Sequence, residues 1–254
     1  MTAPVNPRTE RFAPRPFLTL SVCLVLSASS IALSNGATLA NAVEPEPRNQ
    51  PFIAVTSAIP RLVETDYIEL SKIASISKFR SAEGHDYSDD FESCRSMKHY
   101  FKPDPHLDWS AVRIFSPVRG NILRVEEEWA GRRVEIQAEQ CPALAFIIYH
   151  VKLSKPLWAG DKVSAGQWLG FHIGKATYSD IAVRLNTPAG SKLVSYFEAM
   201  PDSVFEGYRR RGLTTRAEII ISKESRDADP LRCAAGAFTS HGRIAGWVNL
   251  SSPP

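Results

Sequence analysis

Short, closely spaced strand patterns punctuated by glycine constrain the fold of this 254-residue chain more than any other feature. Residues 111–140 read as short strands interrupted by Gly120 and by a "WAG" turn at 129–131. Further strands are predicted at 144–153, "LAFIIYHVKL", and at 179–185, "SDIAVRL". Strands this short and this close predict a mainly β fold with an antiparallel core.

The C-terminal part of the chain changes character. The segment "MPDSVFEGYRRRG" (200–212) predicts a short helix with a glycine stop. Thr215 and Glu218 follow at the spacing of a capping box, which predicts a second helical start. We therefore expect a β domain at 76–212, followed by a helical extension at 213–254 that packs on the core.

The first 42 residues have the pattern of a cleaved export signal. Three arginines precede an apolar run at 17–33, and Ala40 and Ala42 fit an A-x-A cleavage site. A membrane anchor is the alternative, but the run is short, carries four serines, and a span needs about 20 mostly apolar residues. We expect a signal peptide at 1–42, a linker and N-terminal extension at 43–75, and a periplasmic or extracellular protein with no stable membrane span.

The net charge and the cysteine content of the mature chain limit the kinds of ligand and of covalent link that we expect. Removing the signal takes away three arginines and one glutamate, so the formal net charge falls from +3 to +1. A near-neutral chain gives no electrostatic case for binding nucleic acid. Cys94, Cys141 and Cys233 remain in the mature chain. Three cysteines in an exported protein predict one disulfide and one remaining thiol. The spacing alone leaves the pairing and the oligomeric state open.

Two histidines and an aspartate are candidates for metal chemistry. The segment "GHDYSD" (84–89) contains His85 and Asp89, both acceptable zinc ligands. The alternative is a polar turn in which Asp89 caps the next turn and His85 bonds to the backbone. His150 lies on the long apolar strand and, by the period of two, shares a face with Phe146 and Ile148. A histidine in such a place is commonly a buried structural residue.

Four segments in order, "GHDYSD", "IIYHVKL", "AGDKVSAGQWLG" and "SDIAVRL", resemble the lysostaphin-type zinc endopeptidases, which cut peptide bridges in bacterial cell walls. The resemblance covers roughly residues 78–200. It implies a β core of the barrel-sandwich hybrid, lysostaphin-like type, with zinc as cofactor and peptidoglycan or peptide as partner. It also implies that His85 and Asp89 are metal ligands and that His150 is the catalytic histidine.

The chain also resembles a less characterised set of exported bacterial proteins, through "GHDYSDDFESCRSMKHYF" and "DADPLRC". This similarity implies that Cys94 and Cys233 form the disulfide, with Cys141 outside the pair.

The family's metal site is incomplete in this sequence. The strand that should carry His-x-His has Asp180 and Ala182 at those positions, in the register that turns Ile181 and Val183 to the core. Asp180 could serve as the third metal ligand, or it could form an ion pair with Arg184 on the same face.

Two further histidines could complete a metal site. His99 or His172 could reach it, although both are expected to be structural. We expect His85, Asp89, His150 and Asp180 to converge in one groove, with a gap at Ala182.

Three functions are compatible with this pattern. The favoured one is a degenerate, non-catalytic module that binds peptide or cell-wall fragments, with zinc weakly bound or absent. The second is a metal-dependent cell-wall peptidase or hydrolase with a rearranged zinc site. The third is a structural exported scaffold protein whose polar residues form an internal network.

Overall fold

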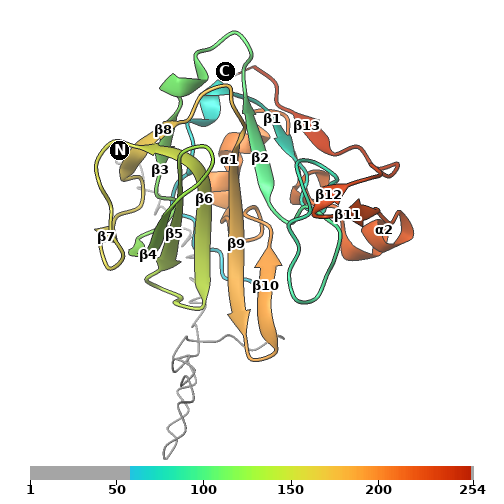
Figure 1. Ribbon diagram of the computed structural model, residues 1–254. Helices are drawn as coiled ribbons and strands as arrows, with labels where there is room; N and C mark the ends of the chain where they lie inside the picture. The colour runs from blue at the N-terminus through green and yellow to red at the C-terminus, as the bar shows by residue number, and fades with distance from the viewer. Residues whose placement is uncertain (1–57, 253–254) are drawn as a thin grey trace, which may run out of the picture.

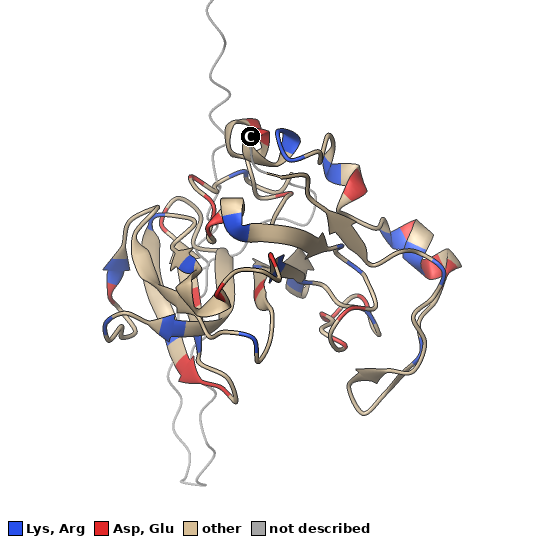
Figure 2. Cartoon of the chain, turned by 90° about the horizontal axis from the view of Figure 1, so that it is seen from above, with Lys and Arg blue, Asp and Glu red and all other residues tan. Residues whose placement is uncertain are grey.

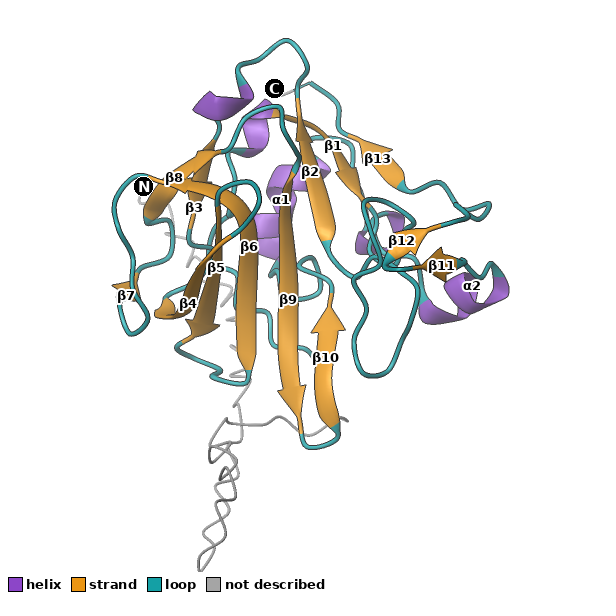
Figure 3. Cartoon of the chain, viewed as in Figure 1, coloured by secondary structure: helices purple, strands orange, loops and turns teal. Residues whose placement is uncertain are grey.

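An antiparallel sheet of 11 strands forms the centre of the protein (Figure 1), and the computed structural model describes residues 58–252. The strands are β1 (Ile73–Ser77), β2 (His99–Pro103), β3 (Arg113–Phe115), β4 (Gly120–Glu127), β5 (Arg132–Ala138), β6 (Leu144–Leu153), β7 (Lys162–Val163), β8 (Trp168–His172), β9 (Ser179–Thr187), β10 (Gly190–Val194), β11 (Cys233–Ala234), β12 (Ala237–Phe238) and β13 (Trp247–Asn249). The helical elements are η1 (Leu70–Lys72), η2 (Trp109–Ala111), α1 (Asp202–Arg209), η3 (Arg216–Glu218) and α2 (Lys223–Ala228). The predicted mainly β, antiparallel fold class is confirmed, and the helices are few and short (Figure 3).

The strand order places β6 and β9 at the middle of the sheet. The order is β13-β1-β2-β9-β6-β5-β4-β7, with β10 added beside β9 and with β8 bridging β3 and β6. The predicted strand "LAFIIYHVKL" is β6, and its first half pairs with β9 while its second half pairs with β8. This change of partner within one strand shapes the site described below.

Side-chain alternation along β6 builds two separate apolar clusters. Phe146 and Ile148 lie in the main core, whereas Ile147 and Tyr149 lie in a smaller cluster on the opposite face. The main core is closed by α1, which lies behind the sheet in Figure 1 and buries Phe205. The face toward the viewer in Figure 1 therefore carries the smaller cluster and the polar residues around it.

The same alternation divides β9. Ile181 and Val183 point into the main core, as the predicted register requires. Asp180 and Ala182 lie on the opposite face, and Ala182 packs in the smaller cluster with Tyr149. Ala182 is 1% exposed, so the expected gap at this position is filled by packed side chains.

The flanking segments belong to the sheet more closely than the sequence indicates. Tyr67, expected in an extension, is fully buried in the main core, and β1 crosses the expected boundary at 75/76. In the C-terminal part β13 pairs with β1, so the segment 213–254 contributes a strand to the large sheet and also holds the β11–β12 hairpin, η3 and α2. Pairing between sequence-distant ends is a long-range contact that local patterns do not encode.

Cys94 and Cys233 are joined by a disulfide across 139 residues, which ties the loop before β2 to the β11–β12 hairpin. The described residues contain no free cysteine, so the expectation of one remaining thiol, placed at Cys141, is wrong. The predicted signal peptide, 1–42, lies outside the described residues.

Charged residues are distributed over the molecule. Lysines and arginines are interspersed with aspartates and glutamates over the described chain (Figure 2). In the part of the chain that the structure describes, no helix has the length and apolar character needed to cross a membrane.

Candidate functional site

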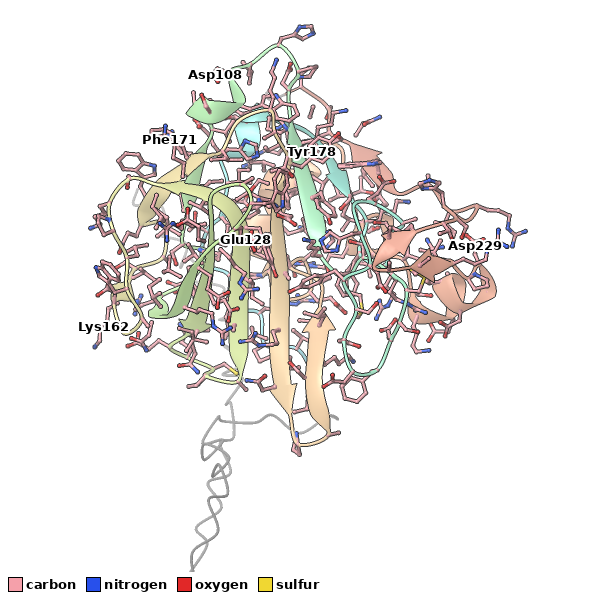
Figure 4. The ribbon with its side chains drawn as sticks, viewed as in Figure 1. Asp108, Glu128, Lys162, Phe171, Tyr178 and Asp229 are labelled. Atoms are coloured by element: carbon pink, nitrogen blue, oxygen red, sulfur yellow. A yellow bond between two sulfur atoms is a disulfide. The ribbon has the colours of Figure 1, made fainter. Side chains whose placement is uncertain are left out.

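A cavity of about 850 Å³ opens on the face of the sheet that carries the smaller cluster. It lies over β6 and β9, and Figure 4 shows Glu128 and Tyr178 near the upper ends of these strands. Aromatic side chains form much of its wall: Tyr87, Tyr100, Trp109, Trp129, Tyr149 and Tyr178. Its charged and titratable residues are His85, Lys98, Glu128, Arg133, His150, Lys175 and Asp180.

His150 reaches the cavity because the backbone of β6 is locally inverted. Tyr149 pairs with β9 and Val151 pairs with β8, and between them His150 has a φ of 61°. A positive φ is strained for a residue with a side chain and is frequent at functional sites. It breaks the alternation that would place His150 with Phe146 and Ile148, so the predicted face for this ring is wrong.

The turn between β4 and β5 holds the histidine ring. The Nδ1 of His150 lies 2.9 Å from the carbonyl oxygen of Ala130, which can only accept, so Nδ1 carries the hydrogen. Gly131, with a φ of 77°, lies so close that an added Cβ would meet the backbone of His150 at 3.1 Å. The glycine of the "WAG" turn is thus required for this close approach. The opposite ring nitrogen, Nε2, faces Asp180 Oδ1 at 3.6 Å.

Lys98 and Asp180 form a buried ion pair under the cavity. Lys98 is 3% exposed and Asp180 is 0% exposed, and the lysine Nζ contacts Asp180 Oδ2. The ammonium also lies 4.8, 5.0 and 4.4 Å from the ring centres of Tyr87, Tyr100 and Tyr149, within the range of cation–π attraction. Burial by itself would lower the pKa of Lys98, but the Asp180 carboxylate more than offsets it and raises this pKa to about 12. The alternative ion pair between Asp180 and Arg184 does not form, since Arg184 pairs with Glu135 at 3.1 Å.

Glu128 stands on the other side of His150. Its Oε2 lies 3.6 Å from His150 Nδ1, and burial raises the pKa of this carboxyl group. Among the described residues, Glu128 Oε2 has no hydrogen-bond partner. The chain therefore places a carboxylate on each side of one imidazole ring.

His85 and Asp89 take different places. His85 lines the cavity at its exposed edge and donates from Nδ1 to the carbonyl oxygen of Asp86 at 2.9 Å. Asp89 is not among the lining residues. Its Oδ1 accepts from the backbone N–H groups of Phe91 and Glu92, each at 2.9 Å, and its Oδ2 accepts from Leu193 N–H at 2.7 Å.

The expected convergence of four residues is therefore wrong for Asp89, which caps a turn. His85, His150 and Asp180 do line one cavity.

The glycine of "GHDYSD" has a packing role. Gly84 has a φ of 73°, and a Cβ at this position would lie 2.0 Å from the hydroxyl oxygen of Tyr100. A residue larger than glycine would displace Tyr100 from the cavity wall.

Zinc does not fit the donors that the sequence predicts. A catalytic zinc site needs about three protein ligands. Both oxygens of Asp89 are engaged by backbone N–H groups, and Asp180 is paired with the Lys98 ammonium. Within residues 58–252, no group of three or more histidine, cysteine, aspartate or glutamate side chains could hold a metal ion. A fixed ammonium thus lies beside the carboxylate proposed as the third ligand.

The two alternative histidines do not complete a metal site. His99 is buried and contacts Ser77 O at 2.8 Å and Ser195 Oγ at 2.7 Å. His172 accepts from Gly174 N–H at 3.1 Å, and its burial lowers its pKa to about 4. Neither residue lines the cavity.

Sequence reasoning missed the residues that give the cavity its character. Lys98 and Tyr100 lie on one side of the segment "SMKHYF" and His99 lies on the other. The alternation of side chains along a strand predicts this arrangement from the sequence. Trp129 belongs to the predicted "WAG" turn, and Glu128 comes directly before it. No local pattern shows that this turn folds over His150.

Comparisons with known proteins show that this chain is similar in fold to several solved structures. No protein-family model and no curated protein matches the sequence. Among similar solved structures, LytM of Ruminococcus gnavus, described as a glycyl-glycine endopeptidase, has 18% identity and a TM-score of 0.33 and covers 40% of this chain and 43% of its own. The complex of SpoIIIAH and SpoIIQ has 13% identity and a TM-score of 0.35, covering 55% of this chain and 97% of that one. Lysostaphin has 12% identity and a TM-score of 0.30, covering 46% and 52%.

The chain thus spans about half the length of LytM and of lysostaphin. Its structural neighbours include peptidases of the lysostaphin type, and the likeness concerns the fold alone.

Proposed function

We propose that this protein is a non-catalytic binding module that takes peptide or cell-wall fragments into the cavity over β6 and β9. The observation that carries the proposal is the buried Lys98–Asp180 pair. Because this ammonium neutralises Asp180, the carboxylate is not available to a metal ion as it would be in a zinc hydrolase. The cavity is nevertheless present, and its polar residues are suited to binding a ligand.

The size and lining of the cavity support binding. Small-molecule sites usually enclose about 300–1,000 Å³ and combine apolar walls with a few fixed polar groups. This cavity encloses about 850 Å³, with aromatic walls and a His150 ring held between two carboxylates. The ligand class comes from the sequence resemblance to enzymes that cut cell-wall peptides.

Export to the periplasm or beyond belongs to the same proposal. The Cys94–Cys233 disulfide supports it, because disulfides persist in oxidising compartments. The mature chain would begin at Val43, after the "ANA" site, and sequencing the N-terminus of the exported form tests this boundary. An intact Met1 in the membrane fraction would contradict it.

Binding to soluble peptidoglycan fragments is the central experiment. The mature chain, 43–254, is titrated with fragments released from purified sacculi by a muramidase, and intrinsic tryptophan fluorescence reports on the cavity wall. Trp129 is 77% exposed at the cavity, and Trp158 is 70% exposed outside it, so Trp129→Ala should weaken binding while Trp158→Ala should not.

Zinc content and activity distinguish the alternative functions. The untagged protein should hold well under one zinc per chain and release no dye from labelled sacculi with or without added zinc. Zinc-dependent hydrolysis would establish the rearranged enzyme instead. Absence of any fragment binding would leave the structural scaffold role.

A further inference from the structure

We propose that the cavity recognises a ligand through a free amino group, whose ammonium lies between Glu128 and Asp180 beside His150. This inference rests on the proposed binding function and names the chemical group that the site selects.

The cavity floor contains buried acceptors that lack donors. In the part of the chain that the structure describes, Glu128 Oε2 and Asp180 Oδ1 are buried and have no hydrogen-bond partner. Leaving a buried acceptor unsatisfied is costly, and such groups in native structures call for a partner. Glu128 Oε2 lies 3.6 Å from Nδ1 of His150 and Asp180 Oδ1 lies 3.6 Å from Nε2, so the two acceptors flank this ring in the same cavity.

The His150 ring lies between the two acceptors but does not satisfy them. Its Nδ1 donates to Ala130 O at 2.9 Å, and its Nε2 lies 3.6 Å from Asp180 Oδ1, which is beyond hydrogen-bond distance. A ligand group with N–H donors would supply the missing hydrogen bonds, and an ammonium has three such donors. The strained φ of 61° that aims His150 into the cavity is consistent with a functional position.

The charges around the cavity leave an opening for a cation. Lys98 is committed to Asp180, and Arg133 pairs with Glu126 and Glu135. Among the acidic residues that line the cavity, Glu128 has no lysine or arginine ion-pair partner within residues 58–252. A ligand carboxylate or phosphate placed between Glu128 and Asp180 would be repelled, and the remaining cation of the lining, Lys175, contacts Pro105 O at 3.5 Å.

The aromatic wall suits the same group. The Trp129 ring lies 5.5 Å from the His150 ring, and Tyr178 lines the cavity as well. An ammonium near such ring faces gains cation–π attraction, most strongly with tryptophan. The three tyrosine rings around Lys98 show that this cavity already accommodates one ammonium in that manner.

The test compares one ligand preparation with its amino groups free and blocked. Soluble muramidase fragments are titrated into the mature chain by calorimetry, untreated and after N-acetylation with acetic anhydride. Hydrogen bonds to charged groups contribute about 1.5–3 kcal/mol, so acetylation should weaken binding roughly 10- to 100-fold. The variant Glu128→Gln should lose this preference for the untreated fragments.

The matched control is Glu127→Gln, one residue away. Glu127 is exposed, pairs with Arg132 and does not line the cavity, so its variant should keep the preference. Fragments that bind equally well before and after acetylation would overturn the inference and leave the proposed function standing, even if Glu128→Gln folds poorly. Untreated fragments that do not bind at all would overturn the proposed function itself.

Discussion

Removing the Lys98 side-chain charge should destabilise the fold strongly at neutral pH. Lys98→Met keeps a long unbranched side chain but leaves the Asp180 carboxylate, 0% exposed, without its counter-ion. Breaking a buried pair in this way typically costs about 3–5 kcal/mol. With a urea m-value of about 2 kcal/mol per molar, a loss of about 4 kcal/mol lowers the unfolding midpoint by about 2 M.

A double variant separates the lost charge balance from lost packing. Lys98→Met combined with Asp180→Asn removes both charges, and replacing a whole buried pair is often neutral or stabilising. The double variant should therefore recover most of the stability, giving a coupling energy of about 2 kcal/mol or more in the cycle. Urea denaturation of the four proteins at pH 7, followed by circular dichroism, provides the measurement.

The pH dependence of this effect has a definite sign. The pKa of Lys98 is raised to about 12 from 10.5, so the stability that it contributes is fully present below about pH 10 and is lost as pH rises through 12. A cost under about 1 kcal/mol at pH 7, or a double variant no more stable than the single one, would refute the reasoning.

Three further outcomes are expected. Replacing Cys94 and Cys233 by serine should lower the free energy of unfolding by about 3–5 kcal/mol, because the bond closes 139 residues; denaturant titration showing a loss under 1 kcal/mol would contradict this. His150→Asn should melt near the wild-type temperature because asparagine tolerates positive φ, whereas His150→Val should cost about 2 kcal/mol; equal melting temperatures would be inconsistent with the strain. Burial raises the pKa of Asp66 to about 7 from 3.8, so the wild-type protein should lose stability as pH rises from 4 through 7. The variant Asp66→Asn should not show this loss. If the melting temperatures of the two proteins changed in parallel from pH 4 to 9, this prediction would be excluded.

The sequence by itself determined the strands and the faces that they bury. β6 coincides with the predicted apolar run 144–153, and β9 begins at the predicted Ser179. On β9 the alternation alone placed Asp180 and Ala182 opposite the core. These features follow from the period of two, which is a property of consecutive residues and is therefore written in the local pattern.

Only the tertiary structure decided what the polar residues do. The inverted backbone at His150 arises where β6 changes partner from β9 to β8, an event that no strand pattern encodes. Lys98 and Asp180 meet across 82 positions of sequence, and Asp89 is satisfied by a backbone N–H of Leu193, 104 positions away. A carboxylate can bind a metal ion, pair with an ammonium or cap a turn, and its residue type is the same in each case. The neighbours that the fold brings to it select among these roles, because the cost of burying a charge must be met by whatever lies within contact distance.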